Sequence, residues 1–110
     1  MKREISGIIT DIMGDRVIVC APELAHAIKE HFENIPQDIL LELIERILKE
    51  PTLIFEERMT NLYHLFYRLD NGKYLVVIVK KAKTGAYFST IYPTGRNIRN
   101  KHKTLKKVKP

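Results

Sequence analysis

Apolar positions in the first part of the chain follow two different periods. Apolar runs flank Gly14-Asp15, a pair typical of two-residue hairpin turns, so residues 1–21 are predicted to form a β-hairpin. The residues that follow repeat apolar side chains every three or four positions, which predicts helices over 22–32 and 36–50. The link between these helices is short, so they are expected to form an antiparallel pair.

The pattern changes to that of strands after Pro51. Four apolar or alternating runs follow, and the Asn71-Gly72 pair is a strong turn signal between the second and the third. Short turns between successive runs imply an antiparallel meander. The predicted fold is therefore α+β, with an N-terminal β-hairpin, two antiparallel helices and a four-stranded antiparallel sheet that the helices cover on one face. The four runs are residues 52–59, 62–69, 73–80 and 85–93.

Charge is distributed unevenly along the chain. Residues 1–70 contain eight Lys or Arg side chains against 13 Asp or Glu, whereas residues 71–110 contain eleven basic side chains and no acidic one. A segment without carboxylates attracts polyanions, and nucleic acid is the commonest polyanion in a cytoplasm. A basic segment that only aids solubility is the alternative.

The length of the chain suits one domain with its own core. This domain is expected to span 1–95, with the hairpin at 1–21 and a core at 22–95, followed by a basic tail at 96–110. No apolar run approaches the roughly 20 residues of a membrane helix, and the start lacks the features of a signal peptide, so a cytoplasmic location is expected. The single Cys20 lies in an apolar run and is expected to be a buried, inert thiol.

Two histidines, His26 and His31, stand in the first predicted helix. At about 100° per residue they lie about 140° apart around the helix axis, unlike the same-face pair of a helical metal site. A catalytic metal needs about three protein ligands, and the sequence offers no convincing third one, so neither a metal nor another cofactor is expected. A histidine can still move a proton near neutral pH. Ordinary surface histidines are the alternative.

Hydroxyl and cationic side chains gather on the last predicted strand. Thr90 and Tyr92 share one face because strand side chains alternate, and with Thr94 they can donate hydrogen bonds to a phosphate. Arg96 follows directly and suits bidentate phosphate contact. These four residues are candidates for binding a nucleic-acid backbone.

A second group lies on the two strands before it. His64, Phe66 and Arg68 share one face, which offers a charge, a stacking surface and another charge to a flexible single strand. Core packing is the alternative for Phe66 because large aromatic side chains are usually buried. Lys80, at the end of its strand, can add charge to the site or remain a solvated lysine.

The order of these signals resembles the phage-associated nucleases of the barnase–EndoU–colicin–RelE-like (BECR) group. That group has a helix with two histidines, a second helix that ends at a proline, and an antiparallel sheet that ends in Thr-x-Tyr. The matching stretches lie within residues 22–95 and read HAIKEH, ILKEPTLIFEER, LFYRLDNGKYLVVIVK and FSTIYPT. The N-terminal hairpin and the basic tail lie outside the resemblance.

The resemblance implies metal-independent cleavage of RNA. In this chemistry a base removes the proton of a ribose 2′-OH, the oxygen attacks the adjacent phosphate, and an acid protonates the leaving 5′ oxygen. His31 and His26 are then the base and the acid, in either order, and Thr90 is the third catalytic candidate. Substrate-binding candidates are Arg68, Lys80, Tyr92, Thr94 and Arg96.

Three functions fit the sequence. The first is a small endoribonuclease, such as a toxin or a phage-derived enzyme, that cleaves RNA through 2′-OH attack. The second is a non-catalytic nucleic-acid-binding module with the same fold. The third is a protein-interaction domain whose acidic first half meets a basic partner. RNA is the expected partner, no membrane is involved, and a protein inhibitor or antitoxin is left open.

Overall fold

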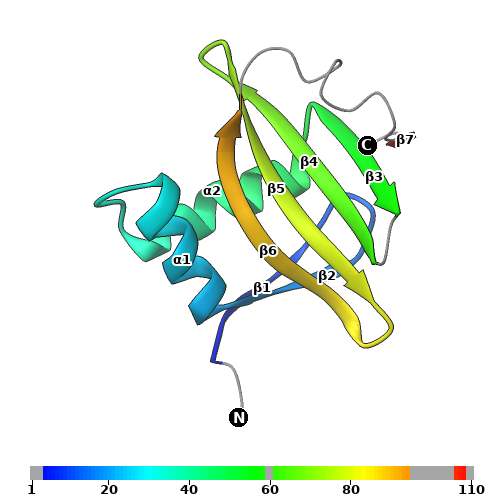
Figure 1. The fold of residues 1–110 in the computed structure, drawn as a ribbon, viewed down its shortest axis with the longest axis horizontal. Coiled ribbons are helices and arrows are strands. Elements are labelled where there is room, and N and C mark those ends of the chain that lie inside the picture. Colours follow the sequence, from blue (N-terminus) through cyan, green and yellow to red (C-terminus); the bar gives the residue numbers. More distant parts are fainter. Residues whose placement is uncertain (1–3, 59–60, 95–105, 109–110) are drawn as a thin grey trace.

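The computed structural model describes residues 4–58, 61–94 and 106–108. The helices and the four strands after them begin and end within one or two residues of the predicted positions. None of the helices in these described ranges has the length and apolar character needed to cross a membrane. The elements are β1 (Ile5–Thr10), β2 (Arg16–Cys20), α1 (Ala21–His31), α2 (Gln37–Lys49), β3 (Leu53–Arg58), β4 (Leu62–Asp70), β5 (Lys73–Ala82), β6 (Gly85–Thr94) and β7 (Lys106–Val108) (Figure 1).

The described strands form one mixed sheet in the order β1-β2-β6-β5-β4-β3-β7. The prediction of a four-stranded antiparallel sheet is wrong. The strands β3 to β6 do form an antiparallel meander, but the N-terminal hairpin extends it, because β2 pairs with β6 in parallel at Val17–Ala86 and Ile18–Tyr87. On the other side β7, within the predicted basic tail, pairs with β3. These pairings join segments far apart in the chain, so local periodicity does not show them.

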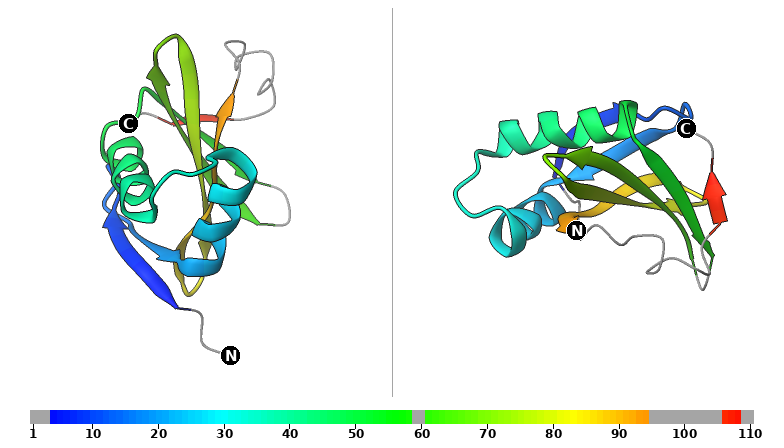
Figure 2. Two further views of the ribbon diagram at one scale, coloured as in Figure 1. Left: turned by 90° about the vertical axis from the view of Figure 1, so that its left-hand side faces the viewer. Right: turned by 90° about the horizontal axis from the view of Figure 1, so that it is seen from above.

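The two helices do not form the predicted antiparallel pair. They run at a steep angle to each other, with α2 on one face of the sheet and α1 beside β6 at the edge (Figures 1 and 2). The helix α1 packs mainly against β6, and α2 packs against β1, β5 and β4. Each helix therefore buries its apolar stripe on the sheet rather than on the other helix, which removes the need for an antiparallel arrangement.

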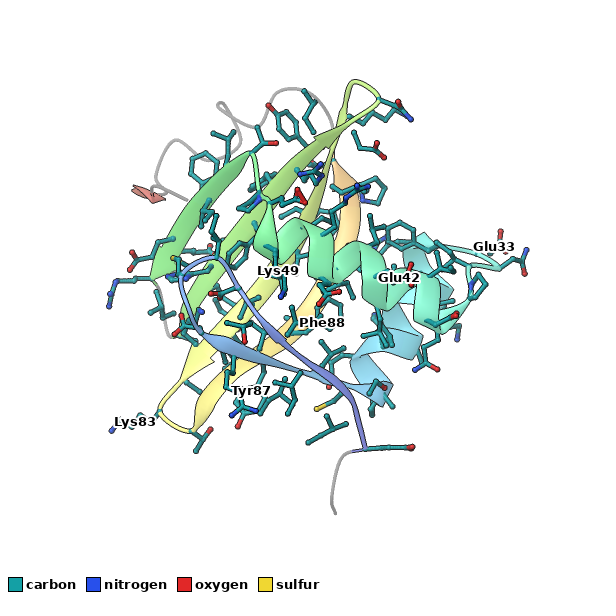
Figure 3. All side chains as sticks on the ribbon, turned by 180° about the vertical axis from the view of Figure 1, so that it is seen from behind. Glu33, Glu42, Lys49, Lys83, Tyr87 and Phe88 are labelled. Carbon is teal, nitrogen blue, oxygen red and sulfur yellow. The ribbon has the colours of Figure 1, made fainter. Side chains whose placement is uncertain are left out.

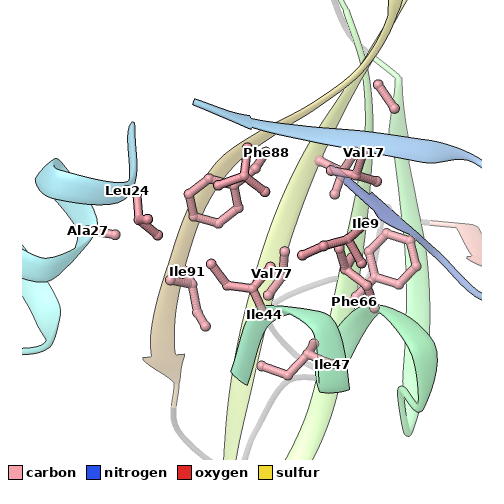
Figure 4. Packing of buried hydrophobic residues seen from close by; sticks show 14 of the residues in the cluster. Ile9, Val17, Leu24, Ala27, Ile44, Ile47, Phe66, Val77, Phe88 and Ile91 are labelled. Atoms are coloured by element: carbon pink, nitrogen blue, oxygen red, sulfur yellow. The ribbon is translucent and has the colours of Figure 1, made fainter. Parts of the chain in front are cut away.

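The main core lies between α2 and the face of the sheet that α2 covers, here called the helix face, and Leu24 and Ala27 of α1 join this core from the edge at β6. The side chains of Ile44 and Ile47 from α2 meet those of Phe66, Val77 and Ile91 from the central strands (Figure 4). All five are completely buried. Burial of this apolar surface is the main force that holds the helices on the sheet.

Side chains on the opposite face of the sheet form a second, smaller cluster around Phe55, Leu65, Tyr67 and Val76. All five tyrosines of the chain point to this face, which is called the tyrosine face below. They are Tyr63, Tyr67, Tyr74, Tyr87 and Tyr92.

Of the two turns predicted above, one is confirmed and the other differs. The Asn71-Gly72 turn between β4 and β5 is confirmed, with positive φ at both residues as a tight two-residue turn requires. The first hairpin instead has a loop over residues 11–15. There the carboxylate of Asp11 accepts hydrogen bonds from the backbone N–H groups of Met13 and Asp15, at 2.9 and 3.0 Å.

Candidate nucleic-acid interface

The last residue of α1 reaches the tyrosine face beside the second half of β6. The described part of β2 pairs with β6 only at Ala86 and Tyr87. The second half of β6 is therefore left for α1, which lies beside it (Figure 1). The ring of His31 lies 5.7 Å from the ring of Tyr92, centroid to centroid, with a tilt of 44°. Two sequence-predicted site residues from distant segments thus come together here.

The helix places the two histidines differently. Leu24 and Ala27 are buried on the sheet, and His31 continues the same stripe one helical turn further on. His26 lies about 140° away from His31 around the axis. It is exposed, and the described residues offer it no hydrogen bond, ion pair or ring contact. The structure therefore brings His31, but not His26, to the strand hydroxyls.

The hydroxyl residues of β6 share the tyrosine face as the alternation predicts. Thr90 pairs with Ile78, and Tyr92 pairs with Val76, so Thr90 stands next to Tyr92 along the strand. Thr94 is buried at the end of β6. Burial, with a smaller contribution from the carboxylate of Glu57, raises the pKa of Tyr92 above its ordinary value. The phenol therefore keeps its proton at neutral pH and can donate a hydrogen bond.

The predicted triplet on β4 does not face this site. His64, Phe66 and Arg68 share the helix face, and Phe66 is a completely buried core residue. Arg68 donates a hydrogen bond to the carbonyl of Glu50, at the end of α2. A cation there satisfies a carbonyl that the helix leaves without an intrahelical partner. In the structure Phe66 therefore packs in the core, and Arg68 caps the end of α2.

Two further predictions concern charge. Arg96 lies outside the described residues. Lys80 is on the tyrosine face, where it pairs across β5 with Tyr63 on one side and Tyr87 on the other. Its ammonium group has no hydrogen-bond or ion-pair partner within the described part of the chain.

The tyrosine face itself was not predicted from the sequence. Tyr87 and Tyr92 are five positions apart on β6, and strict alternation would put them on opposite faces. A bulge at Ser89 changes the register between Ile78 and Val79 of β5, and it returns both tyrosines to one face. The sequence does show that tyrosine recurs in successive strands. Only the strand register, with this bulge, shows that the tyrosine side chains share one face.

A groove of about 600 Å³ opens on the tyrosine face near the turn between β5 and β6. It lies where β6 meets the hairpin and the start of α1, and Lys80 and Tyr87 both line it. The hydroxyl of Tyr87 donates a hydrogen bond to Oγ1 of Thr84, at 3.0 Å. The remaining lining residues are Ile5, Ile18, Cys20, Glu23, Ala82, Thr84, Phe88 and Ser89.

A separate group of charged side chains lies on the helix face under the loop of the first hairpin. Lys81 Nζ lies 3.2 Å from Asp11 Oδ2 and 2.6 Å from Asp15 Oδ2. The nearby Nδ1 of His64 is buried and has no hydrogen-bond partner among residues 4–58, 61–94 and 106–108. Burial, and then the charge of Lys81, lower the pKa of His64, against the opposing effects of Glu56, Asp11 and Asp15. The contacts of Lys81 fix the hairpin loop to β5.

Comparisons with known proteins give no family for the chain. No family model, no curated protein and no solved structure matches it. Within residues 4–58, 61–94 and 106–108, no group of three or more His, Cys, Asp or Glu side chains is placed to hold a metal ion.

Proposed function

We propose that this protein is a metal-independent endoribonuclease that binds single-stranded RNA on its tyrosine face. The observation that carries the proposal is the contact of His31 with Tyr92. It brings the side chain best suited to proton transfer near neutral pH next to hydroxyl donors on a strand. The same face carries aromatic rings and the ammonium of Lys80, which no described side chain neutralises.

In the proposed reaction His31 exchanges protons with the RNA. As a base it takes the proton of a ribose 2′-OH, and the 2′ oxygen forms a bond to the adjacent phosphorus while the bond to the 5′ oxygen breaks. A water molecule gives a proton to the leaving 5′ oxygen, so the products are a 2′,3′-cyclic phosphate and a 5′-hydroxyl. The hydroxyls of Thr90 and Tyr92 would donate hydrogen bonds to the phosphate oxygens as negative charge develops.

RNA binding fits the chemistry of the tyrosine face. Aromatic side chains on a sheet stack on splayed bases of single strands, and this stacking accepts any base sequence. Tyr63, Tyr74, Tyr87 and Tyr92 are all partly exposed, whereas Tyr67 is buried between its neighbours. The excess of basic residues in the second half of the chain supplies attraction to the phosphates.

A non-catalytic RNA-binding module is the second candidate. The position of His26 favours it, because two imidazoles would serve as base and acid most simply, and only His31 lies at the hydroxyls of β6. In that case the tyrosine face would bind RNA without cleaving it.

Incubation of the purified protein with single-stranded RNA in excess EDTA separates the two candidates. The proposal predicts cleavage without divalent ions, products with 2′,3′-cyclic phosphate ends, and no cleavage of DNA of the same sequence, because DNA lacks the 2′-OH. Binding of the RNA without cleavage would support the non-catalytic module instead.

A further inference from the structure

We infer that the groove beside Tyr87 is a subsite for one nucleotide of the RNA, separate from the place of cleavage at His31. This inference rests on the proposed function and deepens it. The phenol ring of Tyr87 would carry the base, and the ammonium of Lys80 would bind the adjoining phosphate.

The shape and lining of the groove suit a nucleotide. Its volume of about 600 Å³ lies within the range of small-molecule sites, which is about 300–1,000 Å³. Apolar side chains make up much of its lining, with a few polar groups among them. That combination is typical of sites that hold a flat base on an apolar surface and orient it with hydrogen bonds.

Tyr87 is held in place before any ligand arrives. Its ring belongs to β6 (Figure 3), and its hydroxyl is fixed by the hydrogen bond to Thr84. A stacking ring that is already ordered loses little conformational freedom on binding. Tyr87 is therefore better suited to carry a base than an aromatic side chain on a loop would be.

Lys80 supplies the positive charge next to this ring. It pairs with Tyr87 directly across β5 and β6, so the two side chains leave neighbouring strands on the same face. No partner within the described residues neutralises the ammonium. Glu23 lines the same groove. Its carboxylate repels anions, so the groove suits one phosphate, placed at Lys80, and disfavours a second one.

The groove is too far from His31 to hold the nucleotide that reacts. Tyr87 and Tyr92 pair with Lys80 and Val76 of β5, and four residues along a strand span about 13 Å. Stacked nucleotides of one strand are only about 3.4 Å apart. The groove therefore binds a nucleotide beyond the cleaved linkage. Only a substrate longer than a dinucleotide can reach both the groove and the cleavage site at His31.

Binding of uncleavable 2′-O-methyl RNA to full-length variants tests the subsite. The substitution Tyr87→Ala should weaken binding of an octanucleotide about tenfold through the loss of one stacked base, and leave dinucleotide binding unchanged. Lys80→Gln should weaken octanucleotide binding and lower the salt dependence of log K by about one phosphate contact. Thermal melts confirm that each variant is folded.

Two matched controls stand close by on the sheet. Tyr63→Ala removes the tyrosine on the other side of Lys80, and Lys83→Gln removes a lysine of the β5–β6 turn; neither residue lines the groove. Both should have smaller effects than Tyr87→Ala and Lys80→Gln. Tyr87→Phe keeps the ring and should bind like the parent within about twofold.

Three results would overturn the inference. If the parent binds and cleaves RNA but Tyr87→Ala and Lys80→Gln bind the octanucleotide as tightly as the parent, the subsite is absent while the proposed function stands. If a free nucleoside monophosphate binds with the same dependence on Tyr87 and the octanucleotide does not bind, the groove is a mononucleotide site. If the parent neither binds nor cleaves RNA, the proposed function fails and the subsite fails with it.

Discussion

Lys81 on β5 contacts the fully buried carboxylate of Asp11, and this ion pair attaches the N-terminal hairpin to the central strands. The Nζ–Oδ2 distance is 3.2 Å, and 12% of the Lys81 side chain is exposed. The carboxylate also accepts the N–H groups of Met13 and Asp15. Its negative charge is therefore hydrogen-bonded on one side and neutralised on the other, as a buried charge requires.

Removing the cation of this pair should destabilise the protein strongly. Lys81→Met leaves the carboxylate of Asp11 buried without its counter-charge, and the expected loss in the free energy of unfolding is about 3–5 kcal/mol. Asp15→Asn removes the partner that is half exposed, and should cost only about 0–1 kcal/mol. Urea unfolding of both variants measures the difference. Equal losses would contradict the assignment of Lys81 and Asp11 as the structural pair.

His64 should make the stability of the protein sensitive to mild acid. Burial and Lys81 hold its pKa below the ordinary value of 6.5, so the unfolded chain takes up a proton more readily than the folded one. Its contribution to stability is then complete above about pH 6.5 and declines as the pH falls from there toward the lowered pKa. Urea unfolding at a series of pH values should show this decline.

A variant without the titrating ring isolates the effect of His64. In His64→Phe the free energy of unfolding should depend less on pH below about 6.5 than in the parent. His26→Gln, which changes an exposed histidine, should retain the pH dependence of the parent. If the two variants show the same slope, His64 is not the group responsible.

Phe66 should matter for stability and not for RNA. It is completely buried among core residues of the helix face, so Phe66→Ala should cost about 3–5 kcal/mol of unfolding free energy. The exposed Leu69 on the same strand gives the control, since Leu69→Ala should cost little. Denaturant unfolding gives both values. A stable Phe66→Ala variant with weakened RNA affinity would instead support a stacking role.

Sequence alone predicted the elements better than their arrangement. The stripes of α1 and α2 and the alternation of β3 to β6 are local patterns, and each determines its own element. The pairing of β2 with β6 is not local: it joins Val17 to Ala86, and the hairpin pattern is equally compatible with a separate unit. The angle between the helices likewise depends on which strands each helix covers, as Figure 2 shows.

In the candidate site, too, single residues could be identified from the sequence, but contacts between distant segments could not. The sequence identified His31 and Tyr92 separately, but their contact depends on the place of α1 beside the second half of β6. The role of Arg68 was missed because the helix end that it caps belongs to a segment far away in the chain. The groove at Tyr87 depends on the register of β6 with its bulge, and periodicity alone does not specify such a register.

The central claim is that His31 transfers protons in RNA cleavage while His26 does not. Cleavage rates of single-stranded RNA in EDTA, measured for His31→Ala and His26→Ala beside the parent, test it most directly. His31→Ala should slow cleavage by about 10²–10⁴-fold with nearly unchanged affinity for uncleavable RNA, and His26→Ala should cleave at close to the parent rate. A His31→Ala variant that cleaves as fast as the parent would contradict the claim.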